Sequence, residues 1–247
     1  MANITERWRS VREKVDTVAK QYGRSPENVR VLAVSKTFPA HDVEEAWQAG
    51  AREFGENYVQ EGIEKIQSLP NLAATWHFIG PLQSNKTRPV ATHFDWVHTI
   101  DRLKIAQRLN DQRPDDLPPL KVCLQVNISA DPDKAGVRED EILDLAEAVQ
   151  ALPRLELRGL MTIPALDLDA ATLAQQFQRM QAWLERLQTL YPAVDTLSMG
   201  MSDDLELAVQ HGSTCVRIGR GIFGHRAAKL STGKASADNS NKAEGTQ

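Results

Sequence analysis

Cysteine is scarce and long apolar runs are missing from this chain, and each absence excludes a class of protein. Only two of the 247 residues are cysteines, Cys123 and Cys215, and both lie within apolar β-branched runs, so we expect buried free thiols. No stretch is long and uncharged enough to span a bilayer, and the chain opens on a polar, amphipathic segment. We therefore expect a cytoplasmic protein with no membrane contact.

Neither sign of charge predominates strongly, since the formal net charge is only -4 at pH 7. No basic stripe with interleaved aromatic residues is present, which argues against nucleic acid as the main partner. His, Cys, Asp and Glu residues show no metal-ligand spacing, and neither a Walker A motif nor a complete dinucleotide fingerprint occurs. The sequence predicts a small-molecule partner and no metal site.

The chain begins with the pattern of an amphipathic helix. Asn3 and Glu6 have the spacing of a capping box, and Gly23 follows the last apolar position as a stop signal. The apolar positions recur at steps of four and three, at Ile4, Trp8, Val11, Val15, Val18 and Tyr22. We expect an extra helix before the first strand.

Apolar runs of strand length then alternate with helical patterns as far as residue 218. The eight runs span residues 29–34, 52–54, 75–79, 96–100, 120–128, 155–161, 196–199 and 214–218. The clearest helical patterns between them cover residues 139–151 and 170–190. Eight such units in this length are typical of an α/β fold of the (β/α)8 TIM barrel type, although a doubly wound open sheet has the same alternation.

We expect this barrel to be a single domain over residues 1–226. Residues 227–247 contain almost no apolar side chains and cannot offset the entropy of ordering, so they predict a disordered polar tail. The first candidate site residue follows the first strand, where a barrel has its active mouth. Lys36 there could offer a neutral amine to an aldehyde, or it could be a rim lysine that reaches solvent.

A second group of candidates follows the last two strands. Gly219 and Gly221 could let backbone N–H groups close on a phosphate, and Ser202 could add a hydroxyl from the neighbouring loop. An ordinary turn and an ordinary helix N-cap, before a helix over residues 203–210, are the alternatives. Arg217 should face the mouth by strand alternation, either as a ligand contact or in a buried ion pair. His77 fits a hydrogen-bonded core histidine better than a ligand.

Five segments of the chain closely resemble the pyridoxal phosphate homeostasis protein family, whose barrel is similar to the N-terminal domain of alanine racemase. They are Leu32–Thr37, Phe54–Glu61, Trp76–Lys86, Leu197–Asp204 and Val216–Gly219. The resemblance implies the closed barrel, with pyridoxal 5'-phosphate as cofactor in a Schiff base on Lys36. It also implies that Asn57 lies near the ring, that Ser202 and Gly219 bind the phosphate and that Arg217 faces the pyridine nitrogen.

One departure from the family concerns the phosphate end of the site. Family members often carry a small hydroxyl residue at position 220, whereas this chain has Arg220, whose guanidinium could take over that contact or point away. Lys134, on the loop after the fifth strand, could offer a second amine, although a solvated loop residue is the simpler interpretation.

The role implied by the resemblance is to buffer pyridoxal phosphate or deliver it to apoenzymes that require it. In alanine racemase the second proton donor comes from a β-rich domain of the partner subunit, and we expect no such domain here, since only the polar tail follows residue 224 in the sequence. Of the tyrosines, only Tyr58 is expected near the mouth. We therefore expect a monomeric, non-catalytic binding protein. The alternatives are a weak pyridoxal phosphate-dependent amino-acid racemase and a Schiff-base aldolase acting on a sugar phosphate.

Overall fold

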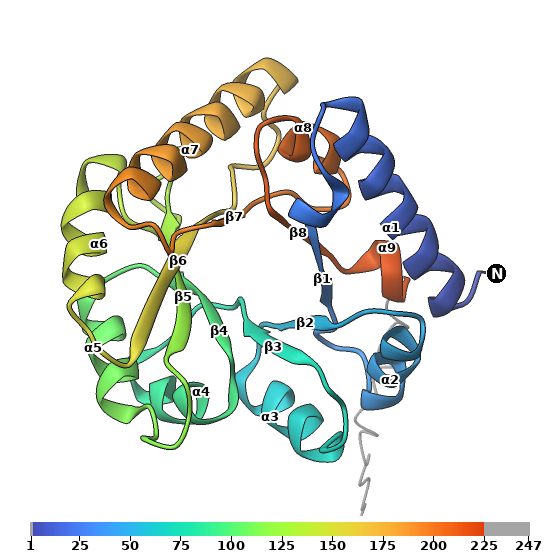
Figure 1. Cartoon of the computed structure of the whole chain (residues 1–247), viewed down its shortest axis with the longest axis horizontal. Helices are drawn as coiled ribbons and strands as arrows, with labels where there is room; N and C mark the ends of the chain where they lie inside the picture. The colour runs from blue at the N-terminus through green and yellow to red at the C-terminus, as the bar shows by residue number, and fades with distance from the viewer. Residues whose placement is uncertain (1, 225–247) are drawn as a thin grey trace, which may run out of the picture.

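A computed structural model of the chain describes residues 2–224, which form a closed barrel of eight parallel strands (Figure 1). β1 pairs with both β2 and β8, so the sheet has no free edge. The (β/α)8 prediction is confirmed and the open sheet is excluded. The predicted tail at residues 227–247 lies outside the described residues. The strands are β1 (Arg30–Val34), β2 (Glu53–Glu56), β3 (Thr75–Phe78), β4 (Trp96–Ile100), β5 (Leu120–Val126), β6 (Leu155–Thr162), β7 (Thr196–Ser198) and β8 (Cys215–Ile218).

Helices form an outer ring around the strands (Figure 1). They are α1 (Ile4–Gln21), α2 (Ala40–Gln48), α3 (Val59–Ser68), α4 (Thr87–His93), α5 (Leu103–Gln112), α6 (Ile142–Gln150), α7 (Ala170–Leu190), α8 (Leu205–Gln210) and α9 (Arg220–Phe223). The predicted first helix is confirmed as α1, with the Asn3–Glu6 capping box formed and Gly23 in the left-handed region at φ 68°. Because α1 packs against α2, α8 and α9, it completes the ring where α8 and α9 are short.

Several predicted boundaries were wrong by one to three residues. The second strand runs to Glu56 rather than Phe54, because the ladder with β3 continues through Gly55 and Glu56 although the apolar pattern has ended. The fifth strand ends at Val126, where the chain turns to bond Val137. The pattern over residues 139–151 begins as a single 3-10 turn, and the helix predicted over residues 203–210 begins at Leu205.

Alternation along the strands divides the apolar residues between two regions. In β1, Val31 and Ala33 belong to the large core between strands and helices, whereas Leu32 and Val34 face the barrel interior with Cys215. Cys123 lies in a second interior cluster, so both cysteines are buried free thiols as predicted. Burial raises the pKa of the Cys215 thiol to about 11, which leaves it protonated and inert at neutral pH.

A glycine permits a close approach between β6 and β7. Gly159 in β6 has φ 157°, and a Cβ at this position would lie 1.8 Å from the carbonyl oxygen of Thr196 in β7. The register between β5 and β6 shifts immediately beside it, between Val122 and Cys123. β6 is therefore irregular on its β5 side, and only a residue without a side chain fits at Gly159 on its β7 side.

Candidate functional site

A pocket of about 560 Å³ opens at the carboxyl ends of the strands, where the mouth of a barrel is expected. All the residues predicted to bind a cofactor line this pocket, together with apolar side chains from the loops after β1, β3, β6 and β7. The lining residues are Val34, Lys36, Phe38, Asn57, Ile79, Ile163, Met201, Ser202, Asp203, Arg217, Gly219, Arg220 and Gly224. Its size and mixed lining are those of a small-molecule site.

The backbone on both sides of Lys36 is held by polar and charged side chains from β1, β2 and α3. Lys65 of α3 donates from Nζ to the carbonyl oxygen of Ser35 at 2.7 Å, and the Ser35 hydroxyl donates to Glu56 Oε1 at 2.6 Å. Glu61 accepts from the backbone N–H of Thr37, which has a positive φ of 70° that is strained for a β-branched residue. These bonds fix the direction in which Lys36 leaves β1.

The same charged groups neutralise one another. Lys65 Nζ lies 2.7 Å from Glu56 Oε1 and 2.7 Å from Glu61 Oε1, and both Lys65 and Glu56 are buried. Burial raises the pKa of the Glu56 carboxyl, and the nearby Lys65 ammonium opposes that rise. We call Glu56, Glu61 and Lys65 the Lys36 clamp, since together they bond to the residues before and after Lys36.

Arg217 forms the floor of the pocket and is almost completely buried. Its guanidinium donates to the Ser198 carbonyl oxygen at 2.6 Å, to Ser198 Oγ at 2.9 Å and to the Thr162 carbonyl oxygen at 2.9 Å. Burial lowers the pKa of the guanidinium, but an arginine remains charged at neutral pH. Among residues 2–224 no carboxylate forms an ion pair with it, so the predicted alternative of a buried ion pair is wrong.

The loops after β7 and β8 converge on one end of the pocket. Ser202 Oγ lies 3.7 Å from the position of a Cβ at Gly221, and such a Cβ would also press against Ile218 at 2.9 Å. Backbone N–H groups at the start of α9 have no acceptor within the helix. Arg220 is exposed and pairs with Asp203 across the two loops at 3.2 Å. The alternative role of Ser202 as an N-cap is wrong, because the N-cap of α8 is Asp204.

Asn57, after β2, forms another wall of the pocket. Its Oδ1 atom is buried and has no hydrogen-bond partner among the described residues. Its backbone lies against Gly80, where a Cβ would come within 2.1 Å of the Asn57 carbonyl oxygen. The lack of a side chain at Gly80 therefore sets the position of Asn57 in the pocket.

Gly80→Ala is expected to displace Asn57 and lower the free energy of unfolding by about 3 kcal/mol or more, because the new methyl group overlaps backbone atoms. Urea unfolding measures the stability, and the side-chain amide resonance of Asn57 reports its displacement. Gly23→Ala is the comparison: a Cβ there meets nothing within 4 Å, so this variant should lose only the roughly 1–2 kcal/mol cost of alanine at a left-handed φ and leave the Asn57 resonance in place. An unshifted Asn57 resonance in Gly80→Ala would contradict this account of the wall.

Other residues considered from the sequence lie elsewhere. His77 is fully buried and hydrogen-bonded to His98 at 2.9 Å, so its interpretation as a core histidine is confirmed. Tyr58 is exposed and is not among the described residues that line the pocket. Lys134 donates to the carbonyl oxygen of Pro164 at 2.5 Å. Within residues 2–224 no metal-binding cluster of His, Cys, Asp or Glu occurs, and no helix there could cross a bilayer.

Sequence reasoning missed the residues that support the site from behind. Glu56 lies within one of the segments that carry the family resemblance, but the sequence assigned no role to it or to Lys65, Ser198 and His98. The spacing of Glu61 and Lys65, four residues apart on one face of α3, could have indicated an ion pair. Nothing in the local pattern indicates that this pair reaches Ser35 in another βα unit.

Comparison with known proteins defines the class of barrel to which this chain belongs. The family model for the alanine racemase N-terminal domain matches residues 7–227. Alanine racemase from Corynebacterium glutamicum shares the fold, with a TM-score of 0.60, at 18% identity over 90% of this chain and 62% of that chain. The fold and the pocket at its mouth therefore define a barrel of the alanine racemase N-terminal type.

More similar relatives define the family. The pyridoxal phosphate homeostasis protein of Escherichia coli is 55% identical over 229 residues, covering 92% of this chain and 98% of the relative. The structure of PipY from Synechococcus elongatus with PLP bound has a TM-score of 0.74 at 38% identity, over 85% of this chain and 99% of that chain. The chain belongs to the pyridoxal phosphate homeostasis protein family, which confirms the resemblance seen in its sequence.

Proposed function

We propose that this chain binds pyridoxal 5'-phosphate in the pocket at the barrel mouth, as a Schiff base on Lys36, and takes part in pyridoxal phosphate homeostasis. The observation that carries the proposal is that Lys36, Arg217 and the Ser202–Gly219 end line one pocket. The PLP-bound structure of PipY supports it, since that relative covers most of this chain.

The chemistry of the lining fits the cofactor. Ser202, the N–H groups beside Gly219 and the Arg220 guanidinium can hold a phosphate at one end of the pocket. Asn57 Oδ1, buried without a partner among the described residues, offers a polar contact near the ring. Bound pyridoxal phosphate supplies an aldehyde, and the Lys36 amine condenses with an aldehyde with loss of water.

Arg217 favours a binding protein over an enzyme. A permanent cation facing the pyridine nitrogen disfavours protonation of that nitrogen, which makes the ring a weaker electron sink than one paired with an aspartate. Tyr58, the tyrosine expected near the mouth, does not line the pocket. The residues that line the pocket therefore bind and orient the cofactor, and Tyr58 is not placed to act as a second proton donor.

The physiological role in this proposal is that of a cytoplasmic, monomeric carrier over residues 1–226, which buffers pyridoxal phosphate or delivers it to apoenzymes that require it. The pocket lies at the barrel mouth beside exposed apolar side chains, Ile163 and Met201, so a ligand has a route in and out. Neither nucleic acid nor a membrane is a partner in this role.

The absorption spectrum of purified protein tests the Schiff base. We expect wild type incubated with pyridoxal phosphate to show a band near the visible edge that disappears on borohydride reduction, and Lys36→Ala to lack it. Lys104→Ala, which removes an exposed lysine of α5, should keep the band. If wild type shows no band, the proposal fails and the sugar-phosphate aldolase becomes the better interpretation.

Proton exchange separates the carrier from the racemase. In deuterated water, the loaded protein should leave the α-proton signal of alanine unchanged over the background rate of free pyridoxal phosphate. Exchange above that background, abolished in Lys36→Ala, would show that the chain is a weak racemase and refute the non-catalytic part of the proposal.

A further inference from the structure

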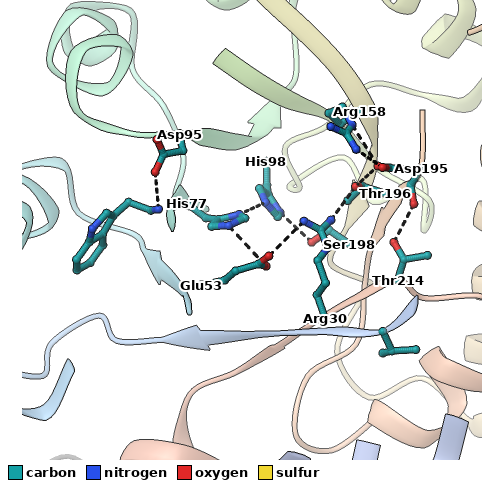
Figure 2. A network of polar contacts seen from close by, with 12 residues as sticks. Arg30, Glu53, His77, Asp95, His98, Arg158, Asp195, Thr196, Ser198 and Thr214 are labelled. Atoms are coloured by element: carbon teal, nitrogen blue, oxygen red, sulfur yellow. Dashed lines mark hydrogen bonds and ion pairs between the residues drawn. The ribbon is translucent and has the colours of Figure 1, made fainter. Parts of the chain in front are cut away.

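A continuous chain of buried polar side chains crosses the barrel interior behind Arg217. Ser198 Oγ lies 2.9 Å from Arg217 Nη1 and 2.9 Å from His98 Nδ1. His98 Nε2 in turn lies 2.9 Å from His77 Nδ1, and His77 Nε2 is 3.7 Å from Glu53 Oε2. Figure 2 shows the part from Ser198 to Glu53. This series of side chains runs from β8 through β7, β4 and β3 to the amino end of β2.

Both histidines are held in a defined orientation. His77 stacks on Trp96 with ring centroids 5.3 Å apart and an interplanar angle of 11°, and it meets His98 edge-on. Both rings are fully buried. Burial lowers the pKa of each histidine well below its ordinary value, with further lowering from neighbouring positive groups, so both rings are neutral at neutral pH.

The hydrogen-bond donors in this series of side chains can be assigned one after another. An arginine can only donate, so Ser198 Oγ accepts from Arg217 and has one hydroxyl proton to give to His98 Nδ1. A neutral His98 that accepts at Nδ1 carries its hydrogen on Nε2, which donates to His77 Nδ1. By the same reasoning His77 carries its hydrogen on Nε2, the atom that faces Glu53.

The Glu53 end of the series agrees with this assignment of donors and acceptors. Glu53 Oε2 and His77 Nε2 are both buried, and neither has a hydrogen-bond partner among the described residues, so each is the obvious partner of the other. Arg30 lies 3.6 Å from Glu53 Oε1 and favours the charged carboxylate. The opposite order would turn an unprotonated His77 nitrogen toward that carboxylate, where two acceptors repel each other.

We propose that Glu53 acts through His77, His98 and Ser198 as the counter-charge that positions Arg217 in the pocket. Every group in this relay turns its acceptor toward the arginine, so the aligned dipoles stabilise the guanidinium and hold Nη1 away from the pocket. The remaining face of the guanidinium is then presented to a ligand in one orientation. These four are positioning residues, and their consequence for cofactor binding rests on the proposed function.

Nitrogen NMR of the full chain, labelled at histidine with ¹⁵N, tests the relay without any ligand. We expect His77 and His98 to be neutral with the hydrogen on Nε2. Glu53→Gln should displace the His77 nitrogen resonances and weaken pyridoxal phosphate binding about fivefold or more. Asp140→Asn is the control: the exposed Asp140 pairs with Arg138 outside the relay, so this variant should change neither the His77 resonances nor pyridoxal phosphate binding.

Ser198→Ala provides a second, internal test. It keeps the carbonyl acceptors of Arg217 and removes the hydroxyl that donates to His98, so it should change the His98 resonances. A hydrogen on Nδ1 of either histidine in wild type, or unchanged resonances in Glu53→Gln, would overturn the relay. The predicted tautomers in a protein that does not bind pyridoxal phosphate would refute the proposed function and leave the relay standing.

Discussion

Lys65→Met is expected to lower the free energy of unfolding by about 3–5 kcal/mol, because it leaves the Glu56 carboxylate buried without its cation. Glu56 is fully buried, and Lys65 Nζ is 2.7 Å from its Oε1 atom. Methionine fills a similar volume, so the loss reports the charge rather than a cavity. Urea unfolding at neutral pH measures the change.

Two further variants make this result specific. Lys14→Met removes an exposed lysine of α1 and should change the stability by less than about 0.5 kcal/mol. Glu56→Gln in the Lys65→Met background removes the uncompensated charge and should recover part of the loss. A loss below about 1 kcal/mol in Lys65→Met, or no recovery in the double variant, would show that the Lys36 clamp does not carry the stability assigned to it.

Acidification from pH 7 to pH 5 is expected to lower the free energy of unfolding by up to about 4 kcal/mol, through His77 and His98. Both are fully buried, and burial keeps the pKa of each well below the ordinary value. The unfolded chain takes up protons at these histidines below about pH 6.5 while the folded protein does not. Each histidine therefore lowers the free energy of unfolding by about 1.4 kcal/mol per pH unit over about 1.5 pH units.

Three carboxyl groups oppose this trend. Burial raises the pKa of Glu53, Glu56 and Asp101, so the folded protein takes up protons there before the unfolded chain does and gains stability as the pH falls. The histidine contribution is therefore read as a difference between proteins, from urea unfolding at several pH values. The variant with both His77→Gln and His98→Gln should show a shallower acid loss than wild type.

The control for the pH experiment is an exposed histidine. The side chain of His41 is 78% exposed, so His41→Gln should keep the wild-type dependence on pH. Equal slopes for wild type and the double histidine variant would mean that the buried pair does not cause the acid loss.

The pocket residues were predictable because each follows the end of a strand run. Lys36 comes directly after an apolar run and Gly219 directly after another, and in a barrel such positions meet at one mouth. The supporting groups were not predictable in the same way. Ser198 and Arg217 are 19 residues apart, and Ser198 and His98 are 100 apart, so no local period connects them.

The sequence by itself determined the number and type of the elements, the free thiols and the candidate residues at the mouth, because apolar periodicity and glycine or proline stops act within a few residues. Only the tertiary structure decided that the sheet closes, through the pairing of Arg30 with Cys215 and its neighbours. It also decided that Lys65 holds Ser35 and that Glu53 lies beside His77. Those contacts join segments from different βα units, and their partners are selected by packing and by the neutralisation of buried charge.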